Sequence, residues 1–502
     1  MKIIVYTCAY NAEKTLRRTI ESILSQTYQN WVYYILDNGS TDRTGAIIGD
    51  YAKTDSRIVY LVNKENNIWE PGSRWRDIIS MQENTDYFTW LDADDEYKKD
   101  FLKEAITFIN RNSLDIAACG SQFIHATTGQ PMQQSYSIPN DLIIFRDGFS
   151  NHFKSYYQFM WTYWGKLYSI SLFQTLDIDK INVSFSWDRI FATELFRLAS
   201  RVGMLSGTLH KYYVSDKSVS YQYSTLRVVS DQICCDFELN YLQEKEALTQ
   251  DNLDRVYATY INAIKNTFII IKNAKIKPLE KLRDIRDIFS HQHTQEILYR
   301  RTVLISDNTR IELQYFVLEY VLLLPDARKG DGFDCVVDIL ASMRNLPDVL
   351  GIQAWGDSEA FDLLVAIRDR RADKSDVTSI DKQIEARIAK FPLLSNVSAT
   401  EALYLRAIIS AVLRNDFVAA MDEVYTVMND EIPDDYAESF IVLAQNISAA
   451  AENMDAYVFF KKTWISYLVD CARNEEASAE LDEFEQILPD DEDFAELRRR
   501  LQ

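Results

Sequence analysis

Asp37, Asp92 and Asp94 have the residue type and the setting for phosphate and metal chemistry. Asp92 and Asp94 directly follow the apolar run 87–91, and Asp37 follows a similar run, 31–36. Two carboxylates at positions i and i+2 just past a strand can both lean into one crevice as the chain turns. Their hard oxygen atoms suit Mg²⁺ or Mn²⁺, with substrate phosphates completing the coordination shell. The alternative for so short an acidic run is a solvated loop.

A different chemistry also places Asp-x-Asp after a strand, namely that of phosphatases with an aspartyl nucleophile. Their motif continues with a small residue and Thr or Val, and it follows the first strand. Here the motif continues with Asp95 and Glu96 and follows the fourth predicted strand. The sequence therefore argues against a phosphatase.

The elements that position these aspartates alternate between strand and helix patterns over the first 120 residues. Leu16, Ile20, Ile23 and Leu24 fall on one face of a helix. The predicted strands are 3–6, 31–36, 58–62, 87–91 and 116–119. Such alternation predicts a mostly parallel sheet covered by helices, with ligands beyond the carboxyl ends of the strands. Asp37 and Asp92 should therefore face one crevice.

Several segments together resemble glycosyltransferase family 2, whose members have the GT-A fold, a Rossmann-like fold that binds nucleotide-diphospho-sugars. The similar segments, in chain order and at family-like spacing over about residues 1–222, are Tyr10–Glu13 with Leu16, Glu21–Tyr28, Asp37–Asp42, Leu91–Asp95, Trp164–Tyr168, Ser186–Asp188 with the helical run 190–198, and Tyr212-Tyr213 with Ser218–Ser220. The resemblance implies an inverting glycosyltransferase that uses a nucleotide-sugar, expected to be a UDP-sugar, and Mn²⁺ or Mg²⁺.

The resemblance also implies roles for residues on the donor side. Asp37 would accept a hydrogen bond from the base, and Tyr10 would pack on that base. Asp92 would contact ribose or sugar, and Asp94 would hold the metal. The full expected nucleotide-sugar set is Tyr10, Asn11, Glu13, Asp37, Asn67, Arg76, Asp92 and Asp94.

On the acceptor side, Asp188 would be the general base that deprotonates the acceptor hydroxyl. Inverting transfer needs one such carboxylate, and a metal stabilises the leaving diphosphate, whereas a glycoside hydrolase needs two carboxyl groups flanking the scissile bond. The alternative for Asp188 is a helix N-cap. Trp164, Lys166 and Trp187 are expected near the acceptor, and His210 is a candidate metal ligand, with a structural role as its alternative.

The sequence departs from the family at three positions. Trp187 precedes Asp188 where the family often has Glu, which puts in doubt an acceptor contact of that acidic neighbour but not the base itself. Asp77 follows Arg76 where the family has Asn. Cys8 stands where the family frequently has Pro.

From about residue 226 the strand patterns end and helical periods follow, as in 360–371, 401–413 and 477–488. We expect two domains, 1–225 with the GT-A fold and 226–502 all-α, the second with a further division near 325–355. Short helices separated by Pro or Asn-Asp favour repeat-like helical hairpins over an irregular bundle. This domain is expected to engage the acceptor or to form a homodimer.

Composition limits the partners. The net charge of −21 argues against nucleic acid and anionic membranes as main partners. The six cysteines are scattered, without a CxxC pair, which is typical of reduced thiols. No signal peptide or membrane-spanning run is apparent, so we expect a cytoplasmic protein, at most peripheral at the inner face of the membrane.

The acceptor stays open at this point between a glycan, in cell-surface polysaccharide synthesis, and a surface or flagellar protein. A non-catalytic helical scaffold with a degenerate sugar-nucleotide domain is a third reading. The presence of Asp37, Asp94 and Asp188 together argues against it.

Overall fold

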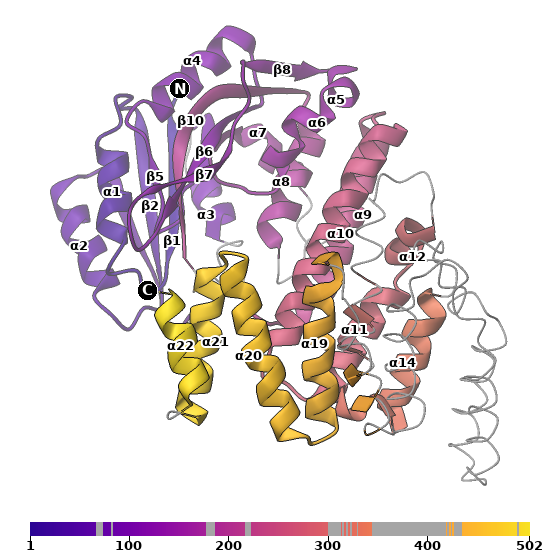
Figure 1. Ribbon diagram of the computed structural model, residues 1–502. Coiled ribbons are helices and arrows are strands. Elements are labelled where there is room, and N and C mark those ends of the chain that lie inside the picture. Colours follow the sequence, from indigo (N-terminus) through magenta and orange to yellow (C-terminus); the bar gives the residue numbers. More distant parts are fainter. Residues whose placement is uncertain are drawn as a thin grey trace. The chain divides into compact units, whose positions relative to one another are not determined.

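A computed structural model describes residues 1–66, 74–81, 84–176, 186–215, 222–299, 434–488 and 491–501, with scattered positions between 313 and 343 and between 418 and 425. Contacts divide the chain into two compact units, Met1–Ala263 and Ile264–Gln502. The first unit combines a sheet with helices, and the described part of the second is helical (Figure 1).

A mixed sheet of ten described strands forms the centre of the first unit, with the path β3-β2-β1-β4-β9-β6-β10-β5 and with β7 on β6 and β8 on β10. The strands are β1 (Ile3–Ala9), β2 (Trp31–Asn38), β3 (Ile58–Asn63), β4 (Tyr87–Trp90), β5 (Glu96–Tyr97), β6 (Ile116–His125), β7 (Pro131–Tyr136), β8 (Leu142–Phe145), β9 (Lys166–Ser169) and β10 (Arg201–Val214). The segment β3-β2-β1-β4 is parallel, as predicted, and β9 joins it to β6 in antiparallel pairing. All five predicted strands are present, and the unit has the predicted GT-A type of α/β fold.

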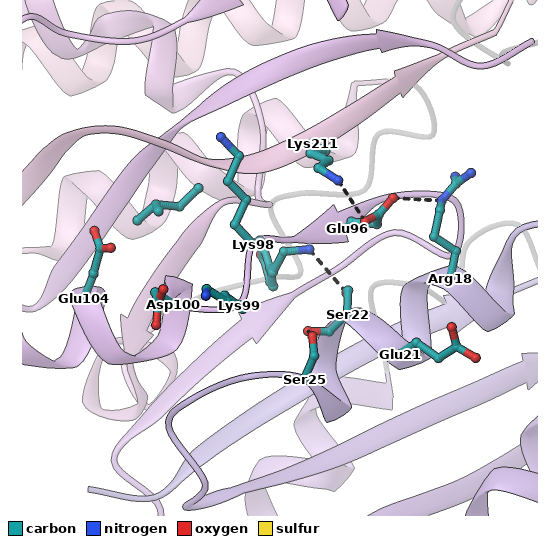
Figure 2. A pocket seen from close by; sticks show the side chains of 12 residues that line it. Arg18, Glu21, Ser22, Ser25, Glu96, Lys98, Lys99, Asp100, Glu104 and Lys211 are labelled. Carbon is teal, nitrogen blue, oxygen red and sulfur yellow. Dashed lines mark hydrogen bonds and ion pairs between the residues drawn. The ribbon is translucent and has the colours of Figure 1, made fainter. Parts of the chain in front are cut away.

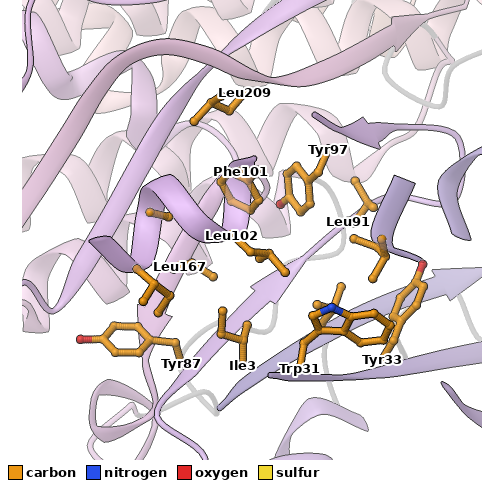
Figure 3. Close-up of a cluster of buried hydrophobic side chains, with 14 of the residues drawn as sticks. Ile3, Trp31, Tyr33, Tyr87, Leu91, Tyr97, Phe101, Leu102, Leu167 and Leu209 are labelled. Carbon is orange, nitrogen blue, oxygen red and sulfur yellow. The ribbon is translucent and has the colours of Figure 1, made fainter. Parts of the chain in front are cut away.

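One face of this sheet is covered by α1 (Leu16–Leu24), α2 (Thr44–Thr54) and α4 (Phe101–Asn112). Side chains alternate between the two faces of a strand, so Ile3 and Val5 of β1 point to these helices. Figure 3 shows part of the resulting core, in which Phe101 stacks on Tyr97 and to which Ile3, Trp31 and Tyr33 also belong. This core fixes the strand ends from which the site residues project.

The opposite face carries an aromatic cluster. It is formed with α3 (Arg74–Met81), α7 (Ile170–Phe173) and α8 (Trp187–Leu198). The rings of Phe88 and Trp90 on β4 lie 4.3 Å apart, and Trp90 lies 5.0 Å from Phe191 of α8. Tilted and edge-on ring pairs of this kind bury large apolar areas in a defined geometry. They fix the first turn of α8, which carries Asp188, against the strand that leads to Asp92.

Three short helices lie between β8 and β9, namely α5 (Gly148–Asn151), α6 (Phe153–Tyr156) and the 3₁₀ helix η2 (Tyr157–Met160). Helix α9 (Leu226–Glu244) is joined to them and to α8. The Tyr156 hydroxyl lies 2.8 Å from that of Tyr241, and Arg189 pairs with Glu238 at 2.6 Å. The first compact unit therefore includes α9 and the start of α10 (Gln250–Asn273), whereas the boundary predicted from sequence falls at 225/226.

The described part of the second unit contains α11 (Pro278–Ser290), α12 (Gln292–Tyr299), η5 (Pro325–Arg328), α14 (Gly330–Met343), α19 (Asp434–Ala450), α20 (Met454–Asp470), α21 (Asn474–Ile487) and α22 (Glu492–Leu501). Successive helices from α19 to α22 pack against one another, which suits both the hairpin array and the bundle. The helix predicted at 477–488 is confirmed by α21. The helices predicted at 360–371 and 401–413, and much of the expected division near 325–355, lie outside the described residues. No helix in the described part of the chain is long and apolar enough to span a bilayer.

Candidate active site

The ends of three parallel strands bring the predicted donor residues to one edge of the sheet. Ala9, at the end of β1, lies opposite Asp37 on β2, and Tyr6 lies opposite Trp90 at the end of β4. The loops that follow β1, β2 and β4 therefore start side by side. This register places Asp37 and Asp92 at the same edge, as expected from the strand pattern, and Tyr10 lies there too.

Asp37 is 7% exposed and has defined partners. Its Oδ1 accepts a hydrogen bond from the Ser40 amide at 2.9 Å, and its Oδ2 accepts one from the Tyr60 hydroxyl at 3.4 Å. A Cβ on Gly45 would lie 2.5 Å from Asp37 Oδ2 and 2.7 Å from the Tyr60 oxygen. The carboxylate is thus held in place, and only a residue without a side chain fits beside it.

Asn11 and Glu13 connect two of the loops at this edge. Asn11 has a φ of 48°, donates its amide to Ser40 Oγ at 3.0 Å, and accepts from the Thr41 amide at 2.9 Å. Glu13 accepts from the Arg43 amide at 3.1 Å. These contacts give both residues a role in shaping the loop around the crevice. The nucleotide contact expected of them stays a prediction.

The other predicted donor residues differ in their setting. Tyr10 is 46% exposed, so its ring is available to a ligand. Arg76 is exposed on α3, with its guanidinium carbon 5.9 Å from the Trp75 ring centroid. On the same helix, Arg74 donates a hydrogen bond to Asn63 Oδ1, at the end of β3, at 3.0 Å. Asn67 lies outside the described residues.

The two aspartates of the Asp-x-Asp motif differ in exposure. Asp92 is half-buried, and its Oδ1 accepts a 2.6 Å hydrogen bond from the Tyr163 hydroxyl. Burial, together with the charges of Asp95 and Asp94, raises the pKa of Asp92 well above its usual range. Asp94 is exposed, although the partial burial of its carboxylate raises its pKa too. A cation bound beside these two carboxylates would favour their ionised forms, which burial alone disfavours.

Asp188 lies in the first turn of α8. Ser186, with a φ of 61°, is the residue at the N-cap, and Asp188 stands two residues further into the helix. Burial raises the pKa of Asp188, while the amide and guanidinium of Arg189 and the ammonium of Lys166 oppose the rise. The charge of Asp188 in turn contributes to the raised pKa of Asp92. The predicted base and the predicted metal motif therefore share one electrostatic environment.

The three residues expected near the acceptor are less exposed than that role suggests. Trp164 is 7% exposed and stacks on His210 with ring centroids 4.5 Å apart. Lys166 is 1% exposed and donates to the carbonyls of Thr162 and Trp164 at 2.7 and 2.9 Å. Burial lowers the pKa of Lys166 to about 7. Trp187 is half-buried and packs edge-on against Tyr163 at 5.7 Å. An acceptor contact by Lys166 would need these buried hydrogen bonds to break.

His210 is fully buried on β10. Its Nδ1 lies 3.1 Å from Ser121 Oγ, and its Nε2 lies 3.2 Å from Asp95 Oδ2. Burial, with the charge of Lys166, lowers the pKa of His210 to about 3, so the ring is neutral near pH 7. Both ring nitrogens thus have protein neighbours. This geometry suits the structural alternative, and the metal-ligand role stays a prediction.

Sequence reasoning missed two tyrosines at this edge. Tyr163 holds Asp92, and Tyr60 lies against Asp37. Tyr163 stands within the aromatic run 161–164, directly before the segment that resembles the family's acceptor side, and that position was the available signal. Tyr60 lies at an exposed position of a predicted strand, and nothing in the surrounding sequence marks it as a site residue.

Comparison with known proteins agrees with this geometry. The model of the family described as glycosyl transferase family 2 matches residues 4–163, which include β1, Asp37, the Asp-x-Asp motif and Tyr163. Residues 4–163 are thus similar in sequence to glycosyltransferase family 2. The family match ends before Asp188, so the role of that residue depends on its geometry and on the resemblance of its segment.

Two curated glycosyltransferases and one solved structure illustrate the similarity. Glycosyltransferase GlyA of Streptococcus pneumoniae is 26% identical over 258 residues, which are 49% of this chain and 36% of GlyA. The glucosyltransferase WfaP of Escherichia coli is 35% identical over 101 residues, 20% of this chain and 38% of WfaP. The structure of S. aureus TarS 1–349 with UDP-GlcNAc aligns over 68% of this chain and 90% of that one, at 18% identity and a TM-score of 0.46. The chain thus spans less than half the length of either curated relative.

Proposed function

We propose that this chain transfers a sugar from a nucleotide-sugar to an acceptor hydroxyl with inversion at the transferred carbon. The observation that carries the proposal is the gathering of Asp37, Asp92 and Asp188 around one edge of a family 2 domain. Asp37 would provide a fixed hydrogen-bond acceptor for the base, and the Asp-x-Asp motif would face the phosphates. Asp188 would provide a carboxylate from the first turn of α8, which packs on the face of the sheet opposite α1.

Asp188 would act as the general base. A base of this kind accepts the proton of the acceptor hydroxyl as that oxygen attacks the sugar carbon, and the bond to the diphosphate breaks on the other side. The raised pKa of Asp188 makes its carboxylate a better proton acceptor than an exposed Asp. Trp187 and Tyr163, which pack edge-on beside it, would limit the entry of water.

The residues at the motif fit a divalent cation. Asp94 is exposed, and the oxygens of Asp92 and Asp94 are the hard donors that Mn²⁺ and Mg²⁺ prefer. Among the described residues no three His, Cys, Asp or Glu side chains group as a metal site. The diphosphate of the donor would therefore have to supply further oxygens. When bound, the ion would neutralise charge on the leaving diphosphate.

We propose a UDP-sugar as donor and a glycan as acceptor. The name of WfaP specifies UDP-glucose as donor and a sugar on diphosphoundecaprenol as acceptor. Asp37, held by Ser40 and Tyr60, offers the acceptor oxygen that the N–H of a uracil requires. The helical second unit is proposed to engage the acceptor or to pair two copies of the chain.

A panel of nucleotide-sugars tests the proposal. Each would be mixed with the full chain in Mn²⁺ or in EDTA, and thermal stabilisation and sugar release would be measured. Binding to the native state raises the Tm by mass action, so one nucleotide class should stabilise the chain even without its acceptor. UDP-sugars should do so in Mn²⁺ and release their sugar slowly. Absence of stabilisation by every nucleotide-sugar would overturn the proposal.

A further inference from the structure

The loop that carries the Asp-x-Asp motif is held at its backbone by a row of side chains. We call residues Leu91–Asp95 the acidic turn. The groups that donate hydrogen bonds to its carbonyl oxygens are Thr7 Oγ1 to Leu91 at 2.6 Å, Thr15 Oγ1 to Ala93 at 2.9 Å, Arg18 Nη2 to Asp94, and Thr19 Oγ1 to Asp95 at 2.9 Å. Four carbonyls of one five-residue segment therefore have side-chain donors.

Most of these donors come from one stripe of α1. Thr15, Arg18 and Thr19 are spaced i, i+3 and i+4, so they lie on the same side of the helix. Leu16, Ile20 and Ile23 are buried in the core. Thr15 stands at the N-cap position, but its side chain makes no capping bond to the helix. Its hydroxyl is thus committed to the acidic turn and to the preceding loop.

Arg18 is itself fixed from the far side. Its Nε lies 3.2 Å from Glu96 Oε1, and its guanidinium carbon lies 3.5 Å from the centre of the Tyr213 ring. Lys211 pairs with the same Glu96 at 3.1 Å. Figure 2 shows Arg18, Glu96 and Lys211 among the residues that line an open pocket of about 630 Å³.

The end of the turn is anchored to the sheet. The Asp95 side chain is fully buried, accepts from the Tyr213 amide at 2.9 Å, and lies 3.2 Å from His210. The turn therefore has hydrogen bonds both to α1 and to β10. Asp94 stays exposed between them.

We infer that Thr15, Arg18 and Thr19 are positioning residues that hold the acidic turn so that Asp92 and Asp94 present their carboxylates to the donor. The turn carries three carboxyl groups, those of Asp92, Asp94 and Asp95, and like charges placed so close together repel one another. The hydrogen bonds to the carbonyl oxygens of the turn oppose a rearrangement that would move the aspartates apart. A turn that is already ordered binds its ligand without the free-energy cost of ordering it. The functional part of this inference rests on the proposed donor site.

The test uses the full chain with Thr15→Val and Thr19→Val combined, since Val keeps the shape of Thr and loses only the hydroxyl. Thr15→Val alone is a second variant, because Thr15 is half-buried and tolerates the change more easily. Thr27→Val is the matched control. Thr27, just past α1, donates to Lys99 O and to Asp100 Oδ1 at 3.3 and 2.8 Å, away from the acidic turn. Thr15→Ser with Thr19→Ser keeps both hydroxyls.

Hydrogen exchange of the ligand-free chain is the first readout. Exchange of the peptide covering 91–96 should accelerate about tenfold in the Val variants, as the loss of one or two hydrogen bonds implies. It should stay unchanged in Thr27→Val and be largely restored by the Ser variant. Unchanged exchange in the double Val variant would overturn the inference, whatever the chain catalyses.

Steady-state kinetics is the second readout. The donor KM in Mn²⁺ should rise about tenfold in the double Val variant, while kcat changes less than threefold. A variant that was only less stable would lose active enzyme, with an unchanged KM. If exchange responds but the wild-type chain transfers no sugar, the positioning stands and the proposed function fails. An unchanged donor KM in an active double variant would refute the link to the donor.

Discussion

The carboxylate of Asp188 experiences two opposed influences. Its place in the first turn of α8 favours the ionised form, because the helix N-terminus is positive. Burial disfavours that form, and burial prevails, since the pKa of Asp188 is raised. An Asp with a raised pKa is protonated, and inactive as a base, at a higher pH than an exposed Asp.

Asp188→Asn should fold, bind the nucleotide-sugar and lose transfer by about 10²–10⁴-fold, the usual contribution of a general base. In the wild-type chain, kcat/KM should fall as the pH drops through the raised pKa of Asp188. Rates measured from pH 4 to 9 check both points. Transfer by the Asn variant near the wild-type rate would show that another group accepts the proton.

Gly45 lies in the first turn of α2, beside Asp37. Gly45→Ala should favour the helix by about 1 kcal/mol in propensity, yet its methyl group would displace the carboxylate of Asp37, 2.5 Å away. We expect nucleotide affinity to fall at least tenfold in titration calorimetry without loss of stability. Gly49→Ala is the control in the same helix, because the nearest atom to its new Cβ, on Tyr60, is 4.0 Å away. If both variants bound the nucleotide with equal affinity, Asp37 would have no part in recognition of the base.

At the scale of elements, α8 is fixed by α9. Arg189 and Glu238 are 14% and 1% exposed and form a two-bond ion pair at 2.6 and 2.7 Å. The Tyr157 hydroxyl also donates to Glu238, at 2.5 Å. Arg189 directly follows Asp188 in α8, so its pair with Glu238 lets α9 help to set the position of the proposed base.

Glu238→Gln should lower the free energy of unfolding by about 3–5 kcal/mol, because it leaves the buried Arg189 cation without a counter-charge. Glu244→Gln is the matched control. Glu244 is 55% exposed and pairs with Arg197, which keeps Glu194 as a partner, so the cost should stay below about 1 kcal/mol. Urea denaturation checks both variants, and similar losses would mean that the Arg189 pair is not effectively buried.

Local patterns in the sequence predicted β1 to β4, the start of β6 and the helix α1, since these depend on hydrophobic periodicity. They could not predict β9, which inserts antiparallel between β4 and β6, because that pairing joins segments far apart in the chain. The hydrogen bond from Tyr163 to Asp92 depends on this pairing. The same long-range contacts bury Lys166, a lysine whose sequence position gave no sign of burial.

At the scale of the whole molecule, the first compact unit extends beyond the point where the strand patterns end. Strand patterns stop near residue 225, but α9 buries Cys234, Tyr241 and Leu242 within the first unit. Asn252, at the start of α10, also donates to Ser150 O at 3.1 Å. Sequence periodicity does not reveal which unit a helix packs on.

A chain truncated to residues 1–225 should therefore aggregate or melt at a lower temperature, because it exposes the apolar surface that α9 covers. A chain of residues 1–263, the whole of the first compact unit, should stay monodisperse and bind the nucleotide-sugar. Size-exclusion chromatography and thermal melts of the two fragments provide the comparison. A well-folded 1–225 fragment with the same Tm would place the boundary where the strand patterns end.

The acidic turn is proposed to bind a nucleotide-sugar through a divalent cation. Titration calorimetry of a UDP-sugar into the full chain, in Mn²⁺ and in EDTA, tests it most directly with Asp94→Ala and Asp94→Asn. The wild-type chain should bind more tightly in Mn²⁺ than in EDTA, and both variants should lose that difference, because the exposed Asp94 provides a hard oxygen ligand. If either variant kept the full Mn²⁺-dependent affinity, the cation would have to bind elsewhere, and the account of this site would be wrong.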